Sequence, residues 1–238
     1  MRVLATIGAC TALAATSALS ADFVGFESDG WYGMNLDGSS ADIVSGAEFA
    51  VIDIYAQFDD SETDGFAFAD STVLSIFDAT IEMSDGRSFK QADVAGGSWD
   101  PKFSFDLPSA GSLPWVDSFV AIGGDPGATN NTNLDPNFDP STGGFVAEGA
   151  GWFTGAPEAL QGRVDSENLQ TFLGRFVVTN IDAGGESISF SASMSYNYGI
   201  GTGTYFETGG DSWEIPVPAP GALALLGLGG IVARRRRG

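Results

Sequence analysis

Apolar and polar residues alternate with a period of two over much of the chain. In residues 186–196 (ESISFSASMSY), apolar residues occupy every second position from Ile188 to Tyr196, and serines occupy positions between them. Successive side chains of a strand point to opposite faces, so this pattern predicts a strand with one face in a core and the other in water. Residues 171–181 (TFLGRFVVTNI) precede it across the turn sequence Asp-Ala-Gly-Gly, which predicts an antiparallel hairpin.

Three further segments, rich in apolar β-forming residues and separated by Gly, Asp and Asn, have the composition of strands. These segments are residues 47–58, 71–83 and 115–122. Asp85-Gly86 is typical of a hairpin turn. Residues 159–173 could hold a short helix, and residues 120–150 contain the longest loop-like segment. Without strand–helix–strand alternation, the pattern predicts an all-β fold, an antiparallel β-sandwich of the jelly-roll or Ig-like kind.

The two ends of the chain have a different pattern. Residues 1–21 contain a basic Arg2, a run of small apolar residues and a small-x-small cleavage sequence at residues 18–20, which predicts a signal peptide. All the predicted strands lie within residues 22–214, which are predicted to form the β-sandwich ectodomain. Residues 215–238 are predicted to be a separate tail.

Residue types needed for several kinds of catalysis are missing. The chain of 238 residues has no histidine, and its single cysteine, Cys10, lies in the predicted signal peptide. Zinc sites of the Cys/His type and Ser-His-Asp or Cys-His catalysis are therefore excluded. The 31 acidic residues offer many carboxylate pairs, but no spacing distinguishes the acid and the nucleophile of a glycosidase. We therefore predict that the protein is not an enzyme.

Charge is distributed unevenly along the chain. Five of the ten basic residues are Arg2 and the four arginines at 234–237, so the chain between them carries five bases against 31 acids, a net charge of −26. Such a surface repels phosphate groups. The sequence therefore predicts that no nucleic acid is a partner.

One polar segment has the spacing of a calcium loop, with oxygen-bearing side chains at alternate positions that would let the backbone surround a hard cation. The candidate ligands are Asp135, Asn137, Asp139 and Ser141. Two positions depart from the pattern, because Pro140 stands where the loop needs glycine and Val146 stands where it needs an acid. The alternative is a solvated turn cluster. Calcium is the only cofactor for which the sequence offers a candidate site.

Aromatic residues offer a second hypothesis, since large rings form either a platform for sugars or part of a core. The candidates are Trp31, Tyr32, Trp99, Trp115, Trp152 and Trp213. With the candidate calcium loop, they leave open the alternative that the protein is a calcium-dependent carbohydrate-binding or adhesion module.

The tail has three parts. Pro216, Pro218 and Pro220 prevent strand or helix and form a short extended hinge. Residues 221–233 are apolar and predicted to be helical, but their 13 residues span only roughly 20 Å, less than the roughly 30 Å of a bilayer core. Four arginines follow and would hold the C-terminus in the cytoplasm. They are Arg234, Arg235, Arg236 and Arg237. This order of proline hinge, short apolar segment and arginines predicts temporary retention at a membrane, followed by removal of the tail.

Val217-Pro218-Ala219-Pro220, the apolar segment and the closing arginines resemble a PEP-CTERM sorting signal, also called the ice-binding-protein C-terminal motif. Ala219 replaces the usual Glu, and the resemblance covers residues 215–238 only. It implies an exported bacterial protein that a membrane-embedded exosortase cuts near the proline motif, and an association with the cell surface, exopolysaccharide or biofilm matrix. With the signal peptide, which requires the Sec export machinery, the sequence predicts a surface-sorted, non-catalytic protein of the cell envelope or extracellular matrix.

Overall fold

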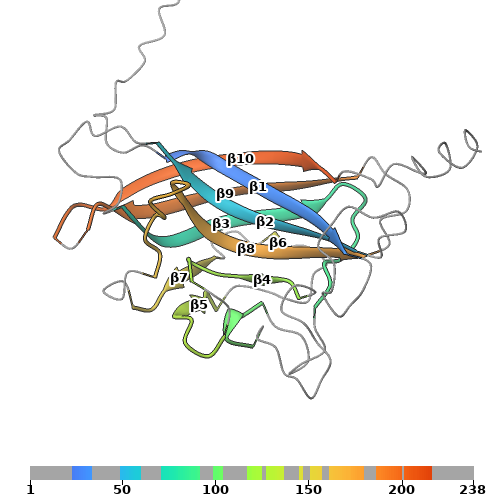
Figure 1. Cartoon of the computed structure of the whole chain (residues 1–238), viewed down its shortest axis with the longest axis horizontal. Coiled ribbons are helices and arrows are strands. Elements are labelled where there is room, and N and C mark those ends of the chain that lie inside the picture. The colour runs from blue at the N-terminus through green and yellow to red at the C-terminus, as the bar shows by residue number, and fades with distance from the viewer. Residues whose placement is uncertain are drawn as a thin grey trace, which may run out of the picture.

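The computed structural model contains ten strands and one 3-10 turn, Pro101–Phe103, in its described part (Figure 1). The described residues are 23–33, 49–59, 71–91, 99–103, 117–124, 127–136, 145–146, 151–156, 161–179, 186–199 and 201–215. The predicted signal peptide lies outside them, as does the tail after Ile215. All observed strand pairings are antiparallel, which confirms the all-β class.

The first sheet has four strands in the order β1-β2-β8-β4. They are β1 (Phe23–Gly33), β2 (Phe49–Phe58), β8 (Gln170–Thr179) and β4 (Phe119–Val120). Along β2, alternate residues from Ala50 to Phe58 point into the core, as the period-two pattern predicts.

The second sheet has six strands, with the path β10-β9-β3-β7-β5 and β6 paired to β3. They are β10 (Tyr205–Glu214), β9 (Ser187–Asn197), β3 (Thr72–Met83), β7 (Trp152–Thr154), β5 (Thr132–Leu134) and β6 (Phe145–Val146). In β9 the apolar residues from Ile188 to Tyr196 are buried and the serines lie on the opposite face, which confirms the prediction for this strand except at Ser195, which is buried too.

The two sheets pack against each other around one hydrophobic core to which both contribute. Aromatic rings meet across the interface. The rings of Phe26 and Phe190 lie 4.9 Å apart at 88°, and those of Phe58 and Tyr196 lie 5.4 Å apart at 74°. These are edge-to-face contacts, an arrangement that aromatic rings favour. The long strands of both sheets cross in projection in Figure 1, with β4, β5 and β7 below them.

The predicted hairpin between residues 171–181 and 186–196 is wrong, although both strands exist. β8 pairs with β2 and β4, whereas β9 pairs with β10 and β3, so the chain changes sheets between them. Val177 and Val178 of β8 are both buried, although they point to opposite faces. A strand buried on both faces is favoured inside a sheet, and β8 has that place between β2 and β4.

Two other local predictions are corrected. Residues 161–169 form turns and Gln170 begins β8, so the described part of 159–173 contains no helix. The predicted loop at 120–150 contains β5 and β6.

Asp85-Gly86 lies at a turn, where the Gly86 N–H donates to Met83 O. The following segment turns away from β3, and the Lys90 N–H donates to Val177 O in the other sheet.

An ion pair between a buried carboxylate and a partly buried guanidinium joins the two central strands of the first sheet. Asp53 and Arg175 are direct cross-strand partners, and the guanidinium donates two hydrogen bonds to the carboxylate at 2.7 and 2.6 Å. Burial raises the pKa of Asp53, although the hydrogen bond and charge of Arg175 oppose that effect. Burial also disfavours the charged form of Arg175, but Asp53 reverses this effect and raises the pKa of the guanidinium. Each charge therefore depends on the other.

We expect Arg175→Met to lower the free energy of unfolding by about 3–5 kcal/mol at pH 7, because it leaves a buried carboxylate unpaired. The loss should shrink as the pH falls through the raised pKa of Asp53, because the protonated carboxyl needs no counter-charge. Urea unfolding of both proteins between pH 4 and 8 measures this difference. An equal loss at every pH would show that Asp53 is not the group left unpaired.

Candidate functional site

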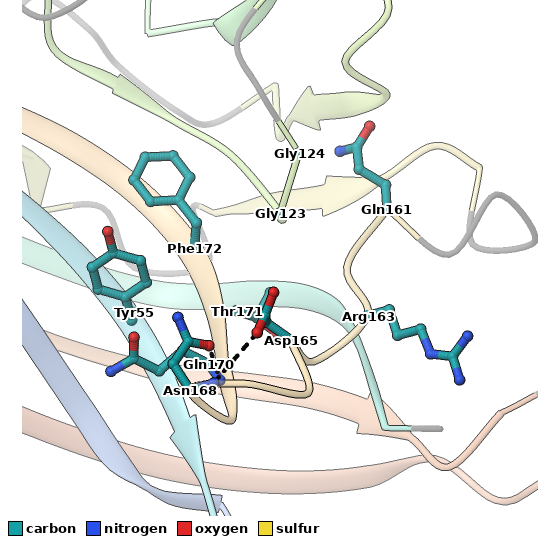
Figure 2. A pocket seen from close by; sticks show the side chains of 10 residues that line it. All are labelled: Tyr55, Gly123, Gly124, Gln161, Arg163, Asp165, Asn168, Gln170, Thr171 and Phe172. Carbon is teal, nitrogen blue, oxygen red and sulfur yellow. Dashed lines mark hydrogen bonds between the residues drawn. The ribbon is translucent and has the colours of Figure 1, made fainter. Parts of the chain in front are cut away.

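A pocket of about 260 Å³ lies beside the first sheet, where β2, the start of β8, the preceding turn and the segment after β4 meet (Figure 2). Its walls combine two aromatic rings, amide side chains, two adjacent glycines, one cationic side chain and one carboxylate. The lining residues are Tyr55, Gly123, Gly124, Gln161, Arg163, Asp165, Asn168, Gln170, Thr171 and Phe172.

The aromatic wall is rigid because its rings pack on one another. The rings of Tyr55 and Phe172 lie 5.7 Å apart at 64°, and Phe119 lies 5.8 Å behind Phe172. Burial raises the pKa of Tyr55 to about 12, and the charges of Asp53 and Asp29 add to the effect. Tyr55 therefore offers a neutral hydroxyl that can both donate and accept at physiological pH.

A hydrogen-bonded turn before β8 forms another side of the pocket. Oδ1 of Asp165 accepts from the N–H groups of Glu167 at 2.7 Å and Asn168 at 3.3 Å. Oδ1 of Asn168 accepts from the Gln170 N–H at 3.2 Å. Asp and Asn favour such turns because a short polar side chain reaches backbone N–H groups nearby. The turn fixes the amide of Asn168 and the carboxylate of Asp165 beside the aromatic wall (Figure 2).

Gly123 brings two backbone segments into close contact at the third side. Its φ of 61° lies in the left-handed region, and a Cβ there would come within 2.0 Å of Gln161 O. No larger residue fits without moving the backbone.

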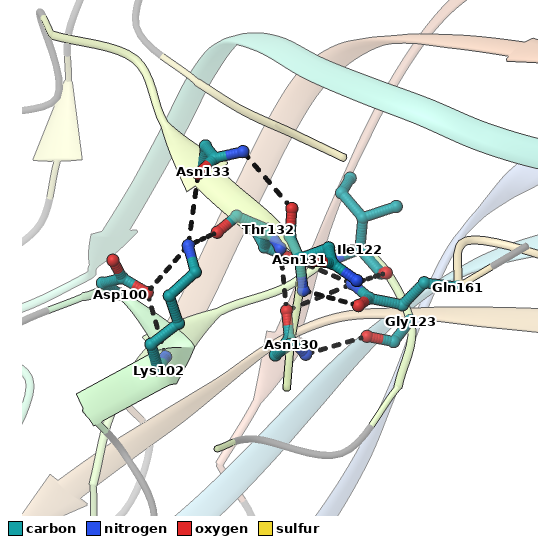
Figure 3. Close-up of polar contacts among 9 residues, drawn as sticks. All are labelled: Asp100, Lys102, Ile122, Gly123, Asn130, Asn131, Thr132, Asn133 and Gln161. Carbon is teal, nitrogen blue, oxygen red and sulfur yellow. Dashed lines mark hydrogen bonds and ion pairs between the residues drawn. The ribbon is translucent and has the colours of Figure 1, made fainter. Parts of the chain in front are cut away.

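Gln161 connects the pocket to a polar network behind it (Figure 3). Its Nε2 donates to Ile122 O at 2.8 Å and Asn130 Oδ1 at 3.1 Å, and its Oε1 accepts from the Asn131 N–H at 2.6 Å. Thr132 Oγ1 accepts from the Ile122 N–H at 2.8 Å.

Lys102 holds the far end of this network. Its ammonium group donates to Thr132 O and to Asn133 Oδ1, the latter at 3.2 Å, and lies 3.8 Å from Asp100. The sequence indicated only a polar loop here. The signal in the sequence that could have indicated this network was the run of polar residues from Asn130 to Asn133. Side chains of this kind can form hydrogen bonds with backbone groups that are not paired in a long strand.

The pocket suits a small polar ligand that is neutral or weakly charged. Its aromatic rings offer apolar contact, and its amide and hydroxyl groups offer both donors and acceptors. Among its lining residues Asp165 is the one carboxylate, and it is engaged in the turn. A glycosidase of the usual kind needs two carboxylates about the scissile bond, so the pocket supplies a binding site more readily than that chemistry.

The predicted calcium ligands fall mainly outside the described residues. Asp135 follows β5 directly, and its N–H donates to Gly151 O at 2.8 Å. Asn137, Asp139 and Ser141 lie outside the described ranges. Within those ranges, no cluster of three or more His, Cys, Asp or Glu residues could hold a metal ion. The calcium site stays a prediction.

The predicted sorting residues Val217, Pro218, Pro220 and Arg234 to Arg237 also lie outside the described part. That part contains no helix long and apolar enough to cross a membrane.

Of the two interpretations of the large aromatic residues, sugar platform or core, two tryptophans follow the second. Trp99 and Trp152 lie in the core, and Trp152 Nε1–H donates to Ala121 O at 2.9 Å. Trp213 packs partly against the core. The side chains of Trp31, Tyr32 and Trp115 lie outside the described residues.

No family model matches the chain, and neither the curated proteins nor the solved structures include a match. The observations that bear on function are therefore the residues and geometry of this chain.

The calcium hypothesis predicts a ligand-dependent rise in melting temperature. A specific site adds about 2.7 kcal/mol of stability when calcium exceeds its Kd a hundredfold. Thermal melting with micromolar to millimolar calcium measures the rise, and Asp139→Asn should abolish it. An equal rise with magnesium or sodium chloride would contradict the site, because screening of the acidic surface would then suffice.

Proposed function

We propose that the protein is an exported, surface-sorted and non-catalytic component of the cell envelope or extracellular matrix. Its C-terminal tail retains it at the membrane after Sec-dependent export, and an exosortase-type enzyme then removes the tail. Exopolysaccharide is the proposed environment of the released body. The jelly-roll or Ig-like sandwich type and the helix at 221–233 belong to this proposal.

The observation that carries the proposal is the position of Ile215, the last residue that the structure describes. Ile215 is 4% exposed, belongs to the hydrophobic core and donates its N–H to Glu186 O at 2.8 Å. The proposed sorting motif begins two residues later, at Val217. Cleavage near this motif would therefore leave Ile215 and the described core residues before it in the protein.

The beginning of the body supports the same proposal. β1 starts at Phe23, two residues after the last residue of the proposed signal peptide, residues 1–21. The rings of Phe23 and Phe26 lie 4.9 Å apart at the edge of the core. Signal peptide cleavage after Ser20 or Ala21 would leave this contact intact.

The alternative is a calcium-dependent carbohydrate-binding or adhesion module. A specific rise in stability with calcium, lost in Asp139→Asn, would favour that alternative. It is compatible with export, because the two proposals concern different parts of the chain.

Replacing Arg234 to Arg237 with glutamine should release the protein into the medium, because the positive charges hold the C-terminus in the cytoplasm. Cell fractionation and immunoblotting of the native host measure the distribution. A matched variant with four lysines keeps the charge and should remain cell-associated. Unchanged localisation of the glutamine variant would contradict the retention role.

A further inference from the structure

The outer face of the second sheet carries a broad array of hydroxyl groups. β9 supplies alternate serines, and the neighbouring strands supply a serine or threonine opposite most of them. The residues are Ser187, Ser189, Ser191, Ser193 and Ser195 of β9, Thr208 and Ser212 of β10, and Ser75 and Thr80 of β3.

Two pairs of these hydroxyls bond across strands. Ser75 Oγ lies 2.6 Å from Ser195 Oγ, and Ser193 Oγ lies 2.9 Å from Thr208 Oγ1. One hydroxyl of each pair donates to the other, so the second keeps its hydrogen and both keep acceptor lone pairs. Ser195 is buried, at 5% exposure, and Ser75 is half-buried, so Ser75 is the hydroxyl of that pair nearer the surface. Thr208 is exposed and Ser193 half-buried, so the second pair presents a donor and acceptors without a charge, which matches the hydroxyl groups of a polyol.

Exposed phenylalanines stand at both ends of one row across this face. The register aligns Phe153 of β7, Ser75, Ser195 and Phe206 of β10. Phe153 is 42% exposed and Phe206 is 66% exposed. Three strand spacings separate the ends, about 14 Å. Phe77 lies in the next row, with its ring 6.3 Å from that of Phe206.

Contiguous exposed apolar patches mark interaction surfaces, whereas single exposed apolar residues are normal. Phe206 is not single, because its ring contacts that of Phe77. Their rings give a broad apolar contact to a flat partner. Phe206 belongs to β10, a strand at the edge of its sheet that pairs only with β9 on the sheet path. A ligand that covers the row would bury both exposed rings.

Charge limits the ligand class. The row from Phe153 to Phe206 and the next row of Phe77, Ser193 and Thr208 contain no charged side chain. Acids on these strands lie elsewhere, as with Glu82 opposite Ser189 and Asp78 in the irregular part of β3. The acidic body would repel a polyanion, and it would also oppose a second copy of this chain.

We propose that this face binds a neutral polysaccharide, which lies across the strands in the row from Phe153 to Phe206. Sugar rings stack on the two phenylalanines, and their hydroxyls bond to the Ser193–Thr208 pair and to Ser75. This site is separate from the pocket beside Tyr55 and needs neither calcium nor the tail. Its failure would leave the sorting proposal untouched, because the localisation of the arginine variants does not involve this face.

The test is co-sedimentation of the purified full-length protein with insoluble neutral polysaccharides (cellulose, mannan and curdlan), and affinity electrophoresis in soluble dextran and alginate. We expect binding to at least one neutral polymer, with similar Kd at 50 and 500 mM sodium chloride. The double variant Phe153→Ser/Phe206→Ser should bind at least about tenfold more weakly, because two stacked rings are lost. Val24→Ser is the matched control, because Val24 is 62% exposed on the other sheet.

Several results would overturn the proposal. They are no binding to any neutral polymer, salt-sensitive binding to alginate alone, or equal binding by the double variant. A concentration-dependent dimer that the double variant abolishes would assign the face to a second copy instead. Phe206→Trp keeps a flat ring and should retain binding, which separates loss of stacking from loss of folding.

Discussion

The packing of two inner sheet faces against each other is the interaction on which the rest of the structure depends. The single cysteine, Cys10, precedes the first strand, so no disulfide can form within the body. Edge-to-face contacts such as Phe26–Phe190 join the layers, and buried aliphatic residues from both sheets fill the space around them. Burial of apolar area is the dominant favourable term in such a fold. Both sheets supply residues to this core, and Ile215, which follows β10, is the last described residue in it.

Once the inner faces are buried, binding chemistry has to occupy the rims and the outer faces. The pocket lies at a rim of the first sheet, where a turn rich in Asp and Asn meets the Tyr55 and Phe172 rings. The hydroxyl array lies on the outer face of the second sheet, supported by strands whose other face is core. Both places are held rigidly by secondary structure or by networks such as that of Gln161, so a ligand would meet preorganised groups. The acidic body and the neutral hydroxyl face together favour uncharged polar ligands.

Period-two patterning predicted strands and their buried faces well, because the side-chain direction in a strand is a local property. The serine face of β9 is the clearest case. Pairing is not local, so the same pattern did not reveal that β8 and β9 belong to different sheets. The buried tryptophans Trp99 and Trp152 show a similar limit, since a large ring on a strand fits either a core or a ligand platform. The Gln161 network joins segments 30 residues apart, and its members resemble loop residues in the sequence. The sequence alone could not predict that Phe153 and Phe206 lie in one exposed row, because their alignment depends on the register of four strands.

Mass spectrometry of the mature, surface-located protein from its host tests the proposed fate of the chain most directly. The proposal predicts a polypeptide that begins at Ala21 or Asp22 and ends near the proline motif, after Ile215 and before the apolar segment at 221–233. Such a chain retains every described strand. A surface-located form that still carries Arg234 to Arg237 would contradict removal of the tail.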